Sequence, residues 1–290
     1  MMDLIFRDQI DKHLAVFIDD INVYSQTFNE HLDHIRQTFE KCRKYGLRLK
    51  KKKCHFACEQ LEFLGHVVSS KGLMVDDRKI EAIQEYGAPK NVQQVKRFLG
   101  MTGYYARFVN RYQGLAIPLT RLTRKKQQFE WTPETEKAMQ AIKDALTTAP
   151  VLAYPNKLQP FILTTDASDT GLGAVLSQFD PEDETEYAVA YASKAMSPAE
   201  RNYNTTHREG LAVIWAVEKF QRYLRGRKFK IITDHAALIS IIKNLEPRGR
   251  VGRWAMKLSE YEFTIEHRNG EDNKFADALS RDPRFESEVQ

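Results

Sequence analysis

The second half of the chain carries an order of strands and helices that few folds accommodate. Runs rich in β-branched and aromatic residues predict strands, and apolar residues at helical spacing predict helices. We expect strands at residues 161–167, 172–178, 186–192, 228–234 and 261–267, and helices at residues 198–224, 236–243, 250–259 and 271–280. Three strands joined by short turns, followed by alternating helices and strands, predict an α/β (α+β) domain with a mixed five-stranded sheet and flanking helices.

Four acidic residues in this half occupy positions at which they could meet. Asp166 and Asp234 lie in the strand-like runs PFILTTDAS and KFKIITDH, and neighbouring strands could bring their carboxylates together. Glu209, in HREGLA, and Asp277, in FADALSR, begin helix-patterned segments. Carboxylates gathered at one spot repel each other unless cations lie between them, and oxygen ligands in this number suit Mg²⁺ or Mn²⁺. The cluster therefore predicts two-metal phosphodiester chemistry.

The charge distribution favours a polyanionic partner. The net charge is only +5, but basic residues gather at residues 50–53, 121–126 and 222–230. Any one of these clusters could equally be a solvated lysine face, whereas three in one chain favour nucleic acid. At 290 residues the chain is long enough for two or three modules that each bury a core.

The cysteines and the chain start indicate an intracellular protein, cytoplasmic or nuclear. Three cysteines, Cys42, Cys54 and Cys58, do not make a disulfide framework and favour a reducing compartment. We find no signal-peptide pattern and no apolar run long enough for a transmembrane helix, so no membrane partner is expected. A zinc site formed by Cys54, His55, Cys58 and His66 is disfavoured, because KCHFACEQLEFLGHVV alternates like a strand. Buried apolar thiols are the expected role of the cysteines.

The first part of the chain predicts a small α/β unit. Residues 14–25, LAVFIDDINVYS, indicate two short strands joined by a tight turn that carries Asp19 and Asp20. Thr27 and Glu30 form a capping box for a helix that ends at Gly46. Its apolar stripe is expected to consist of Leu32, Ile35, Phe39 and Cys42. Residues 47–68 alternate as strands, and Gly65 breaks the last run.

Helical periodicity begins at residue 76 and continues to residue 124. This module is rich in Arg, Lys and Tyr. A closely spaced set could hold a nucleic-acid backbone by charge and stacking: Tyr104, Tyr105, Arg107, Phe108, Arg111 and Tyr112. The alternative is a helix-hairpin core with snorkelling arginines. One more helix is expected over residues 131–146, with Pro133 in its first turn, and prolines then mark a boundary before residue 161.

Taken in order, these segments resemble the reverse transcriptase and ribonuclease H of gypsy-type long-terminal-repeat retrotransposons, which belong to their Pol polyprotein. FIDD at residues 17–20 resembles the Tyr/Phe-x-Asp-Asp turn of reverse transcriptases, and FLGH at residues 63–66 resembles their primer-gripping hairpin. RFLGMTGYYARFV resembles the thumb. YNTTHREGLAVIWAVEKFQRYLRG, ITDHAAL and NKFADALSR are similar to the ribonuclease H domain.

The resemblance implies a division into four segments. These are the C-terminal part of a palm (residues 1–75), a helical thumb (76–129), a connecting helix and linker (130–160) and a ribonuclease H domain (161–285). The fingers and the upstream palm aspartate of the family have no counterpart, so the sequence looks like an N-terminally truncated fragment. We therefore expect no RNA-directed DNA polymerase activity from this chain alone. The missing part of the polyprotein is a possible partner.

The resemblance also implies roles for individual residues. Asp166, Glu209, Asp234 and Asp277 would bind two Mg²⁺ (or Mn²⁺) ions and cleave the RNA strand of an RNA–DNA hybrid. His267, in the loop-like stretch HRNGEDN, would transfer protons, although it could also be a bystander. Asp19 and Asp20 match two metal-binding carboxylates of the polymerase. Nucleic-acid contacts are expected at Phe63, Leu64, Gly65, Tyr104, Tyr105 and Arg107.

Two residues depart from the pattern of the family. Asn22 replaces an apolar residue and suggests relaxed packing of the palm segment. Gly210, inside a helix pattern, should cost that helix about 1 kcal/mol relative to alanine.

The alternative to an enzyme is a non-catalytic nucleic-acid-binding protein derived from such an element.

Overall fold

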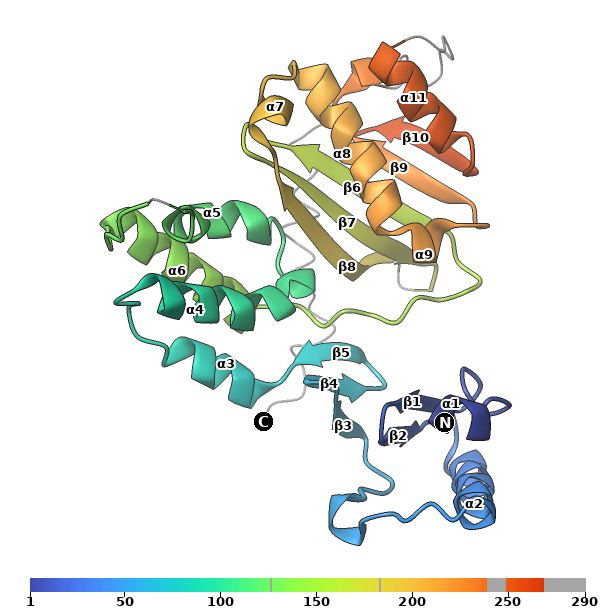
Figure 1. Ribbon diagram of the computed structural model, residues 1–290. Helices are drawn as coiled ribbons and strands as arrows, with labels where there is room; N and C mark the ends of the chain where they lie inside the picture. The colour runs from blue at the N-terminus through green and yellow to red at the C-terminus, as the bar shows by residue number, and fades with distance from the viewer. Residues whose placement is uncertain (126, 183, 239–248, 269–290) are drawn as a thin grey trace. The chain divides into compact units, whose positions relative to one another are not determined.

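The structure is a computed structural model that describes residues 1–125, 127–182, 184–238 and 249–268 (Figure 1). The chain divides into two compact units, Met1–Ser70 and Lys71–Gln290, called unit 1 and unit 2 below. Each unit is described by itself.

Unit 1 is built from short elements around one helix. A short helix, α1 (Met2–Ile5), precedes a hairpin of β1 (Leu14–Phe17) and β2 (Asp20–Val23), followed by the long helix α2 (Phe28–Lys44). The hairpin is antiparallel and pairs Phe17 with Asp20, and Ile18 in its turn has a left-handed φ of 54°. The predicted hairpin and helix are therefore both present.

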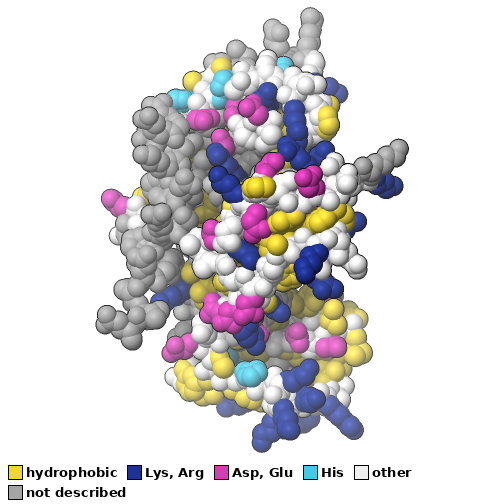
Figure 2. Space-filling view, turned by 90° about the vertical axis from the view of Figure 1, so that its left-hand side faces the viewer, with side chains coloured by type: hydrophobic (Ala, Val, Ile, Leu, Met, Phe, Trp, Pro, Cys, Tyr) yellow, Lys and Arg dark blue, Asp and Glu magenta, His cyan; other side chains and the backbone are white. Residues whose placement is uncertain are grey.

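Local signals define both ends of α2, but its apolar face is only partly covered. Thr27 and Glu30 form the predicted capping box, and Gly46 follows the helix with a φ of +66°. Cys42 is buried, whereas Leu32 is 46% exposed and Phe39 is 41% exposed. The predicted stripe thus packs at one end alone. Figure 2 shows exposed hydrophobic side chains beside groups of Lys and Arg in unit 1, at the bottom of the view.

The predicted strand run over residues 47–68 is wrong for its first half. Residues 51–53 form a 3-10 turn, η1 (Lys51–Lys53), and pairing begins only with β3 (Gln60–Phe63) and β4 (His66–Ser69). Three adjacent lysines repel one another and gain nothing from strand pairing, which explains the loss of that run. The prediction that the cysteine thiols are buried is also wrong for two of them, because Cys54 is half-buried and Cys58 is exposed.

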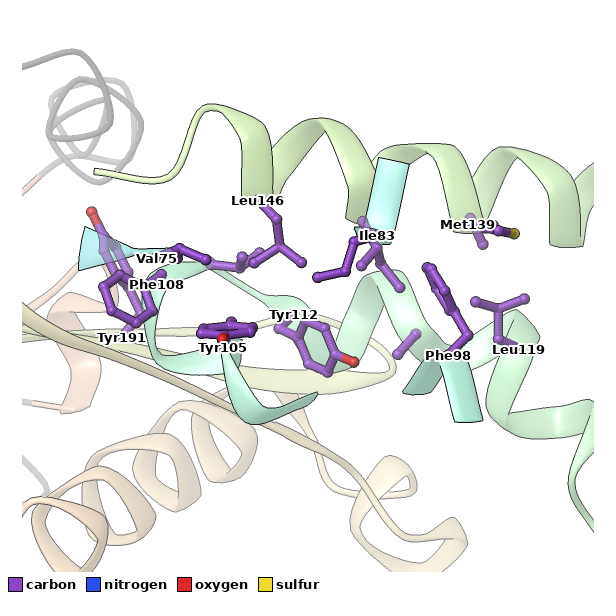
Figure 3. Close-up of a cluster of buried hydrophobic side chains, with 14 of the residues drawn as sticks. Val75, Ile83, Phe98, Tyr105, Phe108, Tyr112, Leu119, Met139, Leu146 and Tyr191 are labelled. Atoms are coloured by element: carbon purple, nitrogen blue, oxygen red, sulfur yellow. The ribbon is translucent and has the colours of Figure 1, made fainter. Parts of the chain in front are cut away.

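The first part of unit 2 is a helical module. Strand β5 (Gly72–Val75) precedes α3 (Asp77–Gln84), α4 (Val92–Tyr104), the 3-10 turn η2 (Ala106–Phe108), α5 (Tyr112–Leu122) and α6 (Pro133–Thr147). Side-chain caps from Asp76, Asn91 and Thr132 begin α3, α4 and α6. The helices surround one apolar cluster, to which the sheet contributes Val175, Ala188 and Tyr191 (Figure 3).

The second part of unit 2 holds the predicted mixed five-stranded sheet. Its strands are β6 (Phe161–Ala167), β7 (Gly171–Asp180), β8 (Thr185–Ala195), β9 (Phe229–Thr233) and β10 (Phe263–His267). The order across the sheet is β10-β9-β6-β7-β8. The three consecutive strands β6, β7 and β8 pair antiparallel, whereas β9 runs parallel to both β6 and β10.

Helices cover one face of this sheet (Figure 1). The single helix predicted over residues 198–224 is divided into α7 (Pro198–Arg201), α8 (Thr205–Lys219) and α9 (Gln221–Leu224), because the cap Asn204 starts a new helix. Val213 and Val217 of α8 pack with Leu163 and Leu176 of the sheet. The predicted helix at 271–280 and most of the one at 236–243 lie outside the described residues. None of the helices in the described ranges has the length and apolar character that a membrane crossing requires.

The glycine at position 210 has a packing reason that the sequence does not show. Helix α11 (Gly249–Leu258) places Trp254 directly against α8. A Cβ atom at Gly210 would lie 2.7 Å from Cζ3 of Trp254, closer than atoms can approach. The glycine therefore weakens its own helix but admits the indole ring that joins α11 to it.

Candidate active site

Strands β6 and β9 place Asp166 and Asp234 at the same end of the sheet. The parallel register runs from Phe161 opposite Phe229 to Thr164 opposite Ile232. The same offset, carried two residues further, places Asp166 beside Asp234. Asp166 is the sixth residue of β6, and Asp234 directly follows β9. The two carboxylates thus share the end of the sheet at which the strand pattern placed them.

Glu209 approaches them from α8. Its side chain is 4% exposed, and its Oε2 atom is buried without a hydrogen-bond partner. Burial raises the pKa of Glu209 to about 8, and the nearby charges of Asp234 and Asp166 add to the increase. A hydrogen bond from the backbone N–H of Ala167 and the charge of Arg111 oppose it. Three sequence-predicted acids therefore lie within one electrostatic neighbourhood.

The chemistry of this neighbourhood fits a divalent cation. A buried, unpartnered carboxylate oxygen whose ionisation is opposed by two other carboxylates is stabilised by a hard cation bound among them. In the described part of the chain, however, no three Asp, Glu, His or Cys side chains already surround a common point at metal-ligand spacing. The fourth predicted ligand, Asp277, lies outside the described residues.

The carboxylate of Asp166 is engaged by Arg111, an arginine that the sequence pattern does not connect with the acids. Nη2 of Arg111 donates a hydrogen bond to Oδ2 of Asp166 and forms an ion pair with it. Arg111 belongs to the helical module, at the start of α5, and is distant from Asp166 in sequence. No spacing pattern could have revealed a contact that depends on how the module packs on the sheet.

Two histidines border the acidic neighbourhood. His267 is the last residue of β10, at the end of the strand predicted over residues 261–267, and its pairing partner on β9 is Thr233. Its Nε2 atom lies 3.0 Å from the backbone oxygen of Asp234. A carbonyl only accepts, so Nε2 is the donor in this contact. Nε2 of His235 is 2.9 Å from Oγ1 of Thr206 and links the end of β9 to the first turn of α8.

The predicted polymerase acids lie in unit 1. Asp19 occupies the β1–β2 turn, and Asp20 is the first residue of β2. Both side chains are exposed, as expected for adjacent acids in a two-residue turn. The turn fixes their backbone, and exposure to water limits their mutual repulsion.

The residues predicted to contact nucleic acid differ in how exposed they are. Leu64 and Gly65 form the β3–β4 turn with positive φ values of 51° and 71°, and Phe63 ends β3 half-buried. Tyr104 is 52% exposed and can offer its ring to a base.

Tyr105 is only 5% exposed and its ring centre lies 6.4 Å from that of Phe108, which favours the core alternative for this residue. A ring enclosed by the core cannot stack on a base. Arg107 is half-buried, and its guanidinium lies 6.0 Å from the centre of the same Phe108 ring.

Two sequence families match this chain. The family described as "Reverse transcriptase (RNA-dependent DNA polymerase)" matches residues 1–68, and the one described as "RNase H-like domain found in reverse transcriptase" matches residues 131–231. The Pol polyprotein of the Drosophila melanogaster transposon opus is 38% identical over 98% of this chain. That of transposon 297 is 36% identical over 97%, and the Schizosaccharomyces pombe Tf2-3 polyprotein is 35% identical over 97%. The chain spans only 29%, 26% and 21% of these polyproteins, respectively.

Solved structures share the fold. A foamy viral protease–reverse transcriptase in complex with double-stranded DNA matches with a TM-score of 0.78 at 20% identity, covering 93% of this chain and 57% of that one. The same viral protein in complex with an RNA/DNA hybrid matches with a TM-score of 0.76 at 19% identity, covering 91% and 37%. Together with the homologous polyproteins, the order of the matching segments shows that this chain belongs to the reverse transcriptase and ribonuclease H region of retrovirus-related Pol polyproteins, of the gypsy type of long-terminal-repeat retrotransposon.

Proposed function

We propose that the chain is a metal-dependent ribonuclease H that hydrolyses the RNA strand of RNA–DNA hybrids. The observation that carries this proposal is the convergence of Asp166, Glu209 and Asp234 on one end of the sheet, with their charges coupled. The family match supports it, as does the fold shared with a viral protein that binds an RNA/DNA hybrid. The preferred ions are Mg²⁺ or Mn²⁺, because every proposed ligand is a carboxylate.

The proposed division of roles follows from position. Asp166, Glu209 and Asp234, with Asp277, would hold two divalent ions. Two such ions supply an activated water and stabilise the leaving 3′ oxygen of the cleaved phosphodiester. Burial of Glu209 excludes water from its Oε2 atom and leaves that atom without a hydrogen-bond partner.

His267 is proposed to move a proton at this site. Its Nε2 atom is held by the backbone oxygen of Asp234, which orients the ring next to a ligand residue. Histidine is the side chain that most often transfers protons in general acid–base catalysis. Its exposed position at the end of β10 gives the ring access to solvent, which can supply or accept the proton.

The boundaries predicted at residues 75, 129 and 160 and the roles of Asp19 and Asp20 remain proposals. Polymerase metal sites need a third acid from the family's upstream palm, and residues 1–290 contain no counterpart of it. We therefore propose that DNA synthesis is not performed by this chain alone and that another part of the polyprotein would supply the rest of the palm. Tyr104, Arg107 and the turn at Leu64 and Gly65 are the proposed nucleic-acid contacts.

The decisive experiment is cleavage of a labelled RNA–DNA hybrid by the purified chain with Mg²⁺ or Mn²⁺. Asp234→Asn should lower the cleavage rate by about a hundredfold or more, because it removes a charge that holds the cation at the site. Asp19→Asn serves as the matched control, since the same change is made in unit 1, and it should leave hybrid cleavage unaltered. A primer-extension assay on the same preparations should show no synthesis.

The opposite outcome would favour the second candidate. A folded chain that binds the hybrid equally well with and without Asp234 or divalent ions, but never cleaves it, would be a non-catalytic nucleic-acid-binding protein. The absence of a preformed three-ligand cluster among the described residues is the observation that keeps this candidate in view.

A further inference from the structure

The start of α5 is fixed by contacts of the two residues that follow Arg111. Tyr112 is 2% exposed within the core of the helical module, and its hydroxyl lies 2.7 Å from Oγ1 of Thr102. The backbone N–H of Gln113 donates to Oγ of Ser193 on β8 at 2.9 Å. Arg111 itself has a left-handed φ of 52°, which is costly for a residue with a side chain. The packing of its neighbours maintains this conformation and directs the arginine toward the sheet.

A glycine opens the path from Arg111 to Asp166. Gly173 on β7 is the cross-strand partner of Asp166 on β6, so a side chain at position 173 would stand beside the carboxylate. The Cγ atom of Arg111 lies 3.4 Å from the position that a Cβ of Gly173 would take. The arginine thus passes position 173 at van der Waals contact distance, and its guanidinium reaches Oδ2 of Asp166.

From this geometry we infer that Arg111 is a resident cation of the nuclease site and competes with the divalent ion for Asp166. The inference rests on the proposed ribonuclease H function. A guanidinium stays charged at any physiological pH, so the pair opens only when another cation replaces it. The charge of Arg111 also acts on Glu209, which places it within reach of two of the proposed ligands.

Competition of this kind would couple the helical module, through Arg111, to the binding of a divalent ion at the site. When Asp166 is paired with Arg111, one proposed ligand is withheld from the metal ion. When a divalent ion takes Asp166, the guanidinium is released beside it, 60% of its side chain being exposed already. A released arginine next to bound metal ions is placed to contact a phosphate of the nucleic acid.

Direct metal binding tests the inference without relying on cleavage. Isothermal titration of the full chain with Mn²⁺ is compared for the wild type and Arg111→Met, which keeps the aliphatic contact with Gly173 and removes the charge. Binding at the site is the component that Asp234→Asn abolishes. We expect Arg111→Met to lower the Mn²⁺ dissociation constant by about fivefold, the size expected for loss of a partly exposed ion pair. Arg111→Lys should fall between the two.

A matched control comes from the opposite layer of the same unit. Lys257 on α11 is 58% exposed and pairs with Glu218 on α8, so Lys257→Met also deletes one exposed ion-paired cation. Its Mn²⁺ affinity should equal that of the wild type. Equal affinity in Arg111→Met, weaker binding there, or no binding in either protein would each overturn the inference. Failure of hybrid cleavage alone would count against the proposed function and not against the competition.

Discussion

Unit 1 and the sheet domain of unit 2 contain similar local signals but bury very different amounts of apolar surface. In unit 1 the buried apolar cluster consists of Ile5, Phe6, Leu14 and Cys42. Large apolar side chains such as Ile18, at 72%, and Phe28, at 63%, are exposed there. The sheet domain instead encloses Leu163, Leu176 and Ile231 completely between sheet and helices.

The difference shows that local sequence signals suffice to form helices and strands, whereas a buried core requires layers of them packed against each other. A hairpin turn and a capping box suffice to define β1, β2 and α2. Those elements have no second layer within unit 1 to cover their apolar faces. The sheet domain has helices against one face and part of the helical module against β8, so its strands become buried on both sides.

The largest expected contrast comes from removing one leucine side chain in each region. Leu163→Ala should lower the free energy of unfolding of the sheet domain by about 2–5 kcal/mol, since the site is fully buried. Leu32→Ala, on the exposed stripe of α2, should change that of unit 1 by less than about 0.5 kcal/mol. Hydrogen exchange followed by mass spectrometry reports each region separately. A loss above about 1 kcal/mol for Leu32→Ala would mean that the α2 stripe is covered after all.

Replacing each of two glycines by alanine should change stability by smaller amounts and with opposite signs, which tests the role of packing between layers. Gly210→Ala should destabilise unit 2 by about 1–3 kcal/mol, because the new methyl group collides with Trp254. Gly100→Ala, in α4 with open space around the position, should stabilise by about 0.5–1 kcal/mol. Urea unfolding followed by tryptophan fluorescence suits both, because all three tryptophans lie in unit 2. Stabilisation by Gly210→Ala would show that Trp254 can move aside.

The smallest expected effect is a pH dependence of the stability of unit 1. Burial lowers the pKa of His13, and the stacked ring of His34 at 3.9 Å and the charge of Lys12 lower it further, while Asp8 opposes them. Since the unfolded chain binds this proton more readily, stability is full above pH 6.5 and falls as the pH drops below that value. Hydrogen exchange of unit 1 amides between pH 7.5 and 5.5 should show faster opening at the acid end, after correction for the intrinsic exchange rate.

The same measurement on variants tests the cause. His13→Phe keeps a ring against His34 without the titrating group and should flatten the pH profile. His55→Asn, at an exposed position of the same unit, should leave the profile as it is in the wild type. An unchanged profile in His13→Phe would assign the acid sensitivity to another group.

Much of the fold could be predicted because its signals are short-range. Strand patterns, caps at Thr27 and Thr132, and the turn at Gly65 all act within a few residues. The expectation failed at residues 47–59, where alternation of residue types exists but no partner strand pairs with it. It failed again within residues 198–224, where the cap formed by Asn204 starts a new helix inside a continuous apolar period.

The site was predictable only in its acidic part. Two strands that run parallel place residues at matching positions side by side, so Asp166 and Asp234 could be paired from sequence. The arginine on Asp166 could not, because Arg111 comes from another module and reaches the sheet through the gap at Gly173. Likewise, Tyr104 and Tyr105 are adjacent in sequence, yet only packing decides that one ring is exposed and the other buried.

By itself, the sequence determined the elements, the mixed sheet, the family and the candidate acids, since each depends on residue type and local spacing. Tertiary structure decided which of those residues face one another and which cation stands among the acids. It also decided why residue 210 must lack a side chain. The physical reason is that burial, charge coupling and close packing are properties of surfaces brought together by the fold, and no stretch of chain carries them alone.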